Sequence, residues 1–179
     1  MTYKVDGVQY IAVQAGWGGG GMSLVPGYSA AYSKPNANRI LVFKLDGGDV
    51  PIPDDLPPVG LTPEPPAQLE GVTAATIAKG AVLFSDNCSI CHSNQPRAPV
   101  PNLLDMRQGT HAAFDRIVLD GLLLPNGMPR WDDLLDAEDT RAIHAYLIDE
   151  QQEAYARDQR DGPQEGVIYS RGTTSRSVQ

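Results

Sequence analysis

A proline-rich segment divides the sequence into two parts that cannot share one continuous helix or strand. Residues 51–66, PIPDDLPPVGLTPEPP, contain seven prolines in sixteen positions. Proline fixes φ and lacks an amide proton, so this segment resists both helix and sheet and favours an extended, semi-rigid chain. We therefore predict a linker over residues 49–69, with separate units over residues 1–48 and residues 70–155.

The part before the linker has the pattern of short antiparallel strands. Asp6-Gly7, which lies between YKV and VQYIAVQA, tolerates the positive φ angles of a type I′ turn. We predict a hairpin over residues 3–15 and a further strand over residues 39–46. The sequence GWGGGG at residues 16–21 matches a nucleotide-binding pattern, but no helix follows it, and we interpret it as a flexible loop.

After the linker, the spacing of apolar residues becomes helical. Thr73 can cap a first helix that runs into the two cysteines. Thr110 can cap a second helix that stops at Gly121. Asp136 can cap a last helix, which has acidic residues in its first turn. Over residues 156–179 the chain turns polar, and we predict a flexible tail in which GVIYS could add a short strand.

The charge of the chain excludes several classes of partner. The formal net charge is -8, so nucleic acid and anionic membrane surfaces would repel the protein. No apolar run approaches the roughly 20 residues that span a bilayer, and we do not expect an integral membrane protein. Between Asp120 and Glu153 there are nine acidic and two basic residues. Most of them fit a solvated helix face, but they would also suit a basic protein partner.

Both cysteines of the chain lie in one motif, NCSICHSNQ at residues 87–95. A disulfide between Cys88 and Cys91 would close a tiny, strained loop, and zinc would need two further ligands at familiar spacings, which the other histidines do not offer. A thioredoxin-like pair expects a preceding strand, whereas a helical pattern precedes this one. The remaining interpretation is the attachment sequence of c-type haem, in which both thiols bind the haem and His92 binds the iron.

A six-coordinate haem iron needs a second axial ligand, for which methionine and histidine are the usual choices. The candidates are Met106, Met128, His111 and His144. Met128 lies in PNGMPRW, where an Asn-Gly turn and a proline present it from a loop of restricted shape. Any one methionine can also simply fill the core. We favour Met128, from this loop and from the resemblance that follows.

Residues 70–155 resemble a class I cytochrome c domain, a mainly α fold. Gly80, Phe84 and Cys88 fall at steps of four. In this family the glycine lets the first helix cross closely over the last, where Tyr146 would pack. The resemblance thus implies a haem domain that follows the linker.

The same family holds the haem histidine through a proline carbonyl in the following loop. Pro101 is the position that resembles this proline, with Pro99 as a rival. Such a bond would fix the imidazole orientation and raise its donor strength. Ser93 departs from the family, which usually has glycine there.

Residues 1–155 also resemble the carboxy-terminal portion of quinohaemoprotein alcohol dehydrogenases. In that family an eight-bladed β-propeller with pyrroloquinoline quinone (PQQ) precedes a proline-rich linker and a cytochrome. YKVDGVQYIAVQAGWGGG and RILVFKLDG are similar to the last propeller strands, and GMPRWDDLLDAEDTRAIHAYL is similar to the methionine loop and final helix. The resemblance implies covalent haem c in this chain, with PQQ and Ca²⁺ only in a full-length parent.

This resemblance implies one-electron transfer from reduced quinone in a propeller domain to a basic redox protein or a respiratory-chain acceptor. Haem c is normally attached outside the cytoplasm, so we expect a periplasmic protein, although the start of this chain has no export signal. The chain could be a fragment of a larger enzyme or a subunit that completes a split propeller. The alternative is a haem-free metal-binding or redox interaction module. We expect no alcohol oxidation by this chain alone.

Overall fold

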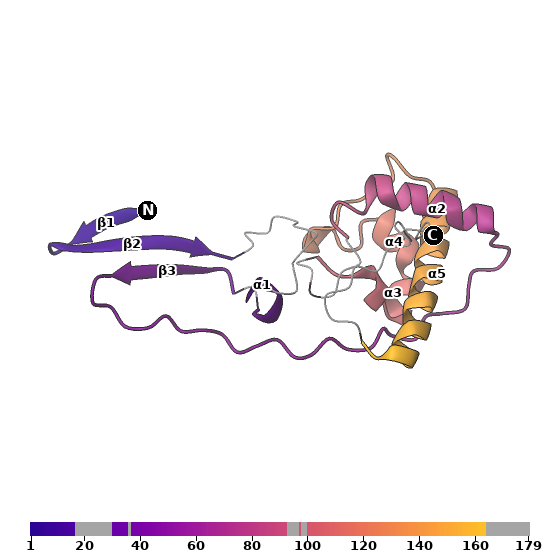
Figure 1. Cartoon of the computed structure of the whole chain (residues 1–179). Helices are drawn as coiled ribbons and strands as arrows, with labels where there is room; N and C mark the ends of the chain where they lie inside the picture. The colour runs from indigo at the N-terminus through magenta and orange to yellow at the C-terminus, as the bar shows by residue number, and fades with distance from the viewer. Residues whose placement is uncertain (17–29, 36, 93–96, 98–99, 164–179) are drawn as a thin grey trace, which may run out of the picture.

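The computed structural model describes residues 1–16, 30–35, 37–92, 97 and 100–163. These residues form a three-stranded sheet near the N-terminus and a helical domain, with a short helix, α1 (Ala30–Ser33), drawn between them (Figure 1). Several sequence expectations lie outside the described residues: the GWGGGG loop after Gly16, Ser93, Pro99 and the GVIYS segment.

The sheet is antiparallel, with strand order β1-β2-β3. Its strands are β1 (Thr2–Val5), β2 (Val8–Ala15) and β3 (Arg39–Lys44). Asp6 and Gly7 join the first two strands with φ angles of 51° and 82°, as a type I′ turn requires. The hairpin is therefore confirmed, and β3 ends two residues before its predicted end.

Apolar side chains are exposed along this sheet. They include Val5, Val8, Ile11, Val13, Ile40 and Val42. The sheet projects away from the helical domain (Figure 1). A small sheet usually needs a packed apolar face to be stable, so these side chains have the pattern of a surface that another unit covers.

Helices α2 (Ala74–Asn87) and α5 (Ala137–Asp161) cross at their closest point through Gly80. A Cβ atom on Gly80 would lie 1.9 Å from the carbonyl oxygen of Ala142. Only a glycine allows this approach. Beside the crossing, the rings of Phe84 and Tyr146 pack with centroids 5.5 Å apart. The predicted close crossing and the place of Tyr146 are both confirmed.

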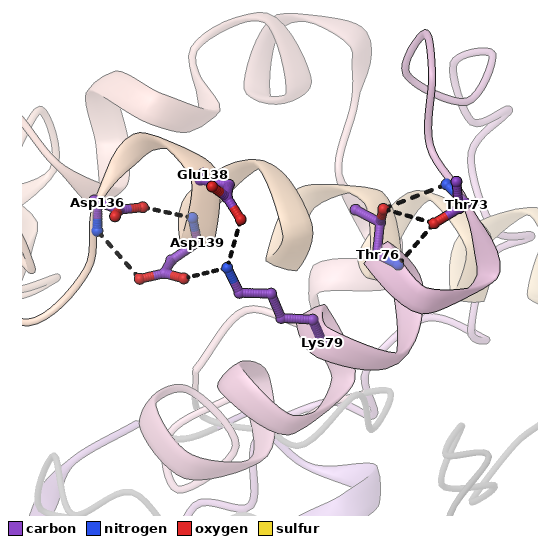
Figure 2. Close-up of polar contacts among 6 residues, drawn as sticks. All are labelled: Thr73, Thr76, Lys79, Asp136, Glu138 and Asp139. Atoms are coloured by element: carbon purple, nitrogen blue, oxygen red, sulfur yellow. Dashed lines mark hydrogen bonds and ion pairs between the residues drawn. The ribbon is translucent and has the colours of Figure 1, made fainter.

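Both crossing helices begin at the residues predicted. Thr73 and Thr76 form a capping box at the start of α2, and Asp136 and Asp139 form another at the start of α5 (Figure 2). Lys79 of α2 links the two helices through ion pairs of 2.9 Å with two acidic residues of α5, Glu138 and Asp139. These local contacts fix the ends of the two helices next to each other.

The middle of the domain consists of short elements. They are the 3₁₀ helices η1 (Leu103–Asp105) and η2 (Leu124–Asn126), and the helices α3 (Gln108–Ala112) and α4 (Phe114–Val118). The single helix predicted here, with Thr110 as its cap, is wrong, because Thr110 lies inside α3 and Arg107 precedes it as the cap. The backbone leaves helical geometry at Ala113, with φ -101° and ψ 7°. This break allows His111 and Phe114 to stack on the same partner, His144.

The last helix is longer than predicted, because one face of its final turns is buried. The sequence placed the start of the polar tail at residue 156, but α5 continues to Asp161. Asp158 is 3% exposed and accepts hydrogen bonds from the amide and the hydroxyl of Thr62, at 2.8 and 2.7 Å. A polar residue in this part of the helix therefore faces the linker instead of solvent.

The second half of the proline-rich linker lies along α5, and we call residues 62–70 the strap. Side-chain amides of α5 and of the strap bind backbone carbonyls across this contact. These bonds run from Gln151 to Pro63 at 3.2 Å, from Gln152 to Pro66 at 3.1 Å and from Gln68 to Ala145 at 2.9 Å. The strap thus belongs structurally to the helical domain, and the tether between the two units is shorter than the proline pattern suggests.

The core of the domain lies between α2, α4 and α5. Its buried members are Phe84, Met106, Phe114, Val118, Leu135, Ile143, Tyr146 and Leu147. In the parts of the chain that the structure describes, no helix combines the length and the apolar character needed to cross a membrane.

Candidate haem-binding site

The two cysteines and the following histidine lie at the C-terminal end of α2, on one turn of chain. The amide of Cys88 caps the helix by donating to the carbonyl of Phe84 at 2.9 Å. The amides of Cys91 and His92 both donate to the carbonyl of Cys88, at 3.1 and 2.9 Å. The helix end therefore places two thiols and an imidazole within a single compact turn.

Both cysteines are free thiols, and Cys88 is half-buried while Cys91 is exposed. Burial, with a smaller contribution from Cys91, raises the pKa of Cys88 to about 11. A redox-active pair lowers a thiol pKa, so this environment does not suit thioredoxin-like chemistry. Among the described residues, no group of three or more His, Cys, Asp or Glu side chains could hold a metal ion. The donor set fits thioether attachment better than zinc or thiol exchange.

The His92 imidazole is held by the loop that follows it. Its Nδ1 lies 2.9 Å from the carbonyl oxygen of Pro101, so Nδ1–H donates and Nε2 keeps its lone pair for a metal. The predicted contact between His92 and the Pro101 carbonyl is confirmed. Burial lowers the pKa of His92, and the Pro101 carbonyl partly opposes this shift. Burial, the larger effect, favours the neutral imidazole, and the Pro101 contact orients the ring; a neutral, oriented imidazole is the form that binds iron.

Three of the four candidates for the second axial ligand are engaged elsewhere. Met106 is 5% exposed within the apolar core, so it fills the core as methionine commonly does. The Nδ1 atom of His111 and the Nε2 atom of His144 lie 3.0 Å apart in a buried contact. Met128 is half-buried and belongs to neither buried core cluster of the described residues.

A tight turn presents Met128 as the sequence suggested. Asn126 ends η2, Gly127 adopts φ 94°, and the amide of Met128 donates back to Leu123 at 3.3 Å. The left-handed conformation at Gly127 is one that glycine adopts without strain. Apolar side chains near the motif and near Met128 are exposed, namely Ile90, Leu122, Leu123 and Leu124. Such side chains fit contact with a porphyrin, so the residues present are consistent with a haem.

The structure adds a buried polar network that was not predicted from the sequence. His111 Nε2 lies 2.7 Å from Oε1 of Gln151, so Nε2–H donates to the amide oxygen, and Nδ1 accepts from Nε2–H of His144. Gln151 also donates to the carbonyl of Met106 at 2.9 Å. Gln151 follows His144 by seven positions, which places both on one face of α5. That spacing was the only available signal.

The fold and the motif together define a class of protein. Residues 75–147 match the family described as cytochrome C oxidase, cbb3-type, subunit III. A first helix that ends in Cys-x-x-Cys-His, a carbonyl on the histidine and a crossing last helix agree with this match. The helical unit is a c-type cytochrome domain, a class that implies covalently bound haem c.

The wider chain is similar to quinohaemoprotein alcohol dehydrogenases. It is 36% identical over 167 residues to quinohemoprotein alcohol dehydrogenase ADH IIB of Pseudomonas putida, covering 87% of this chain and 22% of that protein. The solved structure of ADHIIG from Pseudomonas putida HK5 matches with a TM-score of 0.66 and 32% identity, over 90% of this chain and 22% of that one. The enzyme from Comamonas testosteroni matches with a TM-score of 0.51 and 25% identity, over 87% and 21%.

These similarities indicate which part of the relatives the chain corresponds to. It spans about a fifth of their length. That share is consistent with the C-terminal cytochrome domain of a PQQ-dependent alcohol dehydrogenase, together with the segment that precedes it. A cytochrome domain of this kind transfers electrons through its haem.

Proposed function

We propose that this chain carries one electron at a time through a haem attached to Cys88 and Cys91, with His92 and Met128 as its axial ligands. The observation that carries the proposal is the His92–Pro101 contact of 2.9 Å, beside two free thiols on the same turn. This contact selects the tautomer with the proton on Nδ1, which leaves the lone pair of Nε2 free to bind a metal.

When bound, the haem would supply a reversible one-electron Fe(II)/Fe(III) couple. The protein residues around the iron would determine its ligation and its reduction potential. Pro101 holds the imidazole of His92 in place, and the turn at Gly127 aims the thioether of Met128. A neutral thioether opposite an imidazole favours the ferrous state, which suits an acceptor of electrons from a reduced partner. If His92 and Met128 both bind the iron, no coordination position would remain for substrate.

The electron donor is a quinone-bearing propeller domain, of which strands β1 to β3 form the end. The exposed apolar residues of this sheet support the proposal, because a neighbouring blade would cover them. A short tether between donor and haem makes the transfer intramolecular and raises the effective concentration of one for the other. The same exposed sheet supports a second arrangement, in which a separate subunit supplies the rest of the propeller.

The electron acceptor is a basic redox protein or a respiratory-chain component, and the site of action is the periplasm. The acidic excess between residues 120 and 153 supports a basic partner. Lys79 offsets one of the two negative charges of Glu138 and Asp139, and Glu150 is buried, so this attraction depends mainly on the other exposed acidic residues. Maturation of haem c outside the cytoplasm supports the location.

The ligand assignment can be tested by the absorption spectrum of the haem-loaded protein. Met128→Ala should remove the weak red band of methionine-ligated ferric haem, and the haem should stay covalently attached. Met106→Leu is the matched control, since it conserves core volume and should keep the band. A band that survives in Met128→Ala and disappears in Met106→Leu would transfer the ligand role to Met106.

A further inference from the structure

Three segments that are far apart in the sequence meet at one point between the sheet and the cytochrome domain. One is the end of α1, one is the first half of the linker, and the third is Arg97, five positions after His92. The amide of Leu56 donates to the carbonyl of Ser33 at 2.7 Å, and Lys34 pairs with Asp55 at 2.9 Å. These contacts tie α1 to the linker, and we call this meeting point the junction.

Arg97 closes the junction from the side of the cytochrome domain. Its Nη1 donates to the carbonyl of Tyr32 at 3.2 Å, and its Nη2 donates to the carbonyl of Pro57 at 2.7 Å. Its guanidinium carbon also lies 5.0 Å from the ring centre of Tyr32, which is 4% exposed. One planar guanidinium therefore holds two backbone segments and an aromatic ring, which a lysine could not do.

The backbone at Arg97 shows that this position is constrained. Arg97 has a φ angle of 66°, in the left-handed region that favours glycine. Such conformations persist where surrounding contacts determine them, and they often occur at functional positions. Arg97 also lies between His92 and Pro101 in sequence, and those two residues are joined by the contact that orients the imidazole.

We propose that Arg97 is a positioning residue, which fixes the orientation of the haem-bearing loop relative to the N-terminal strands. This inference rests on the proposed function, in which those strands lead from the domain that supplies the electron. Tyr32 precedes Ser33 and Pro57 follows Leu56, so Arg97 binds next to both ends of the hydrogen bond between Leu56 and Ser33. Loss of the guanidinium should therefore weaken that hydrogen bond as well. Arg97 then contributes to the orientation of the donor side relative to the haem by joining its loop to both α1 and the linker.

The first test is hydrogen exchange at the Leu56 amide in the full chain. In Arg97→Ala and in Arg97→Lys, exchange should rise about tenfold or more, because a charge-assisted contact on each side of the bond is lost. Arg116→Ala, at an exposed arginine of α4, is the matched control and should leave exchange unchanged. Unchanged exchange at Leu56 in Arg97→Ala would overturn the proposal.

The second test measures position instead of stability. Ferric haem shifts the NMR signals of amides by an amount that depends on their place relative to the haem. The haem-induced shifts of the Tyr32 and Ser33 amide signals should fall toward zero in Arg97→Ala and in Arg97→Lys. The red absorption band should remain in both variants. Shifts that persist in both variants would overturn the positioning role. If the wild-type chain carries no haem, the proposed function fails, and exchange at Leu56 still decides the role of Arg97.

Discussion

At the scale of single residues, the buried histidine pair makes stability depend on pH. His144 contacts His111 of α3, stacks on Phe114 of α4 at 4.3 Å and lies near Arg141 of its own helix. Burial, together with the charges of His111 and Arg141, lowers the pKa of His144 from 6.5 to about 4. Between these values the unfolded chain binds a proton that the folded chain does not, so the free energy of unfolding falls as pH falls through this window.

His144→Gln should reduce this dependence. The substitution removes the titrating group, and its amide can still donate to His111. Between pH 7 and pH 5, denaturant unfolding of the haem-loaded wild type should lose about 1 to 2 kcal/mol more than the variant loses. Haem-loaded protein is needed so that ligation engages His92. Equal losses in the two proteins would mean that His144 is not held neutral by the fold.

The residues of the site differ in how well the sequence predicts them. Cys88, Cys91 and His92 lie within five positions of one another, so spacing alone indicates their chemistry, and Pro101 follows close enough for a family pattern to locate it. The contact between His111 and Gln151 joins residues forty positions apart. It depends on the register of α3 against α5, which no local pattern specifies.

At the scale of elements, the crossing of α2 and α5 depends on the absence of one methyl group. Gly80→Ala would place Cβ against the carbonyl of Ala142, a backbone atom that cannot move away without shifting α5. We expect a loss of at least about 3 kcal/mol in the free energy of unfolding, above the usual range for overpacking, despite the higher helix propensity of alanine. Chemical denaturation of the haem-loaded protein measures this loss.

Gly109→Ala is the matched control for this substitution. Gly109 lies inside α3, and a Cβ there would meet no atom within 4 Å. Alanine should leave stability unchanged or raise it by up to about 1 kcal/mol. A similar loss in both variants would show that the close crossing is not the cause.

Among the helices, the two with reciprocal capping boxes were placed correctly from the sequence. Thr73 and Asp136 each form a reciprocal capping box, and their helices begin where predicted. The helix predicted from Thr110 failed because tertiary contacts of His111 and Phe114 split it in two. The end of α5 was missed because the burial of Asp158 against the strap is a long-range effect.

At the scale of the whole molecule, the strap determines how far the two units can separate. Asp158→Ala would leave the amide and hydroxyl of Thr62 buried without their acceptor, which typically costs about 1 to 3 kcal/mol. The strap should then detach, and hydrogen exchange at the Thr62 amide should increase. Asp161→Ala, at an exposed residue of the same helix, should change nothing. Continued protection of Thr62 in Asp158→Ala would show that other contacts hold the strap.

The central claim is that the thiols of Cys88 and Cys91 hold a haem covalently, and intact-protein mass spectrometry tests it most directly. Protein produced with haem-attachment machinery should have the mass of the polypeptide plus one haem, and the added mass should survive denaturation. Cys88→Ser/Cys91→Ser should show the polypeptide mass alone. The account is contradicted if the wild-type protein, matured in the same way, also has only the mass of the bare polypeptide.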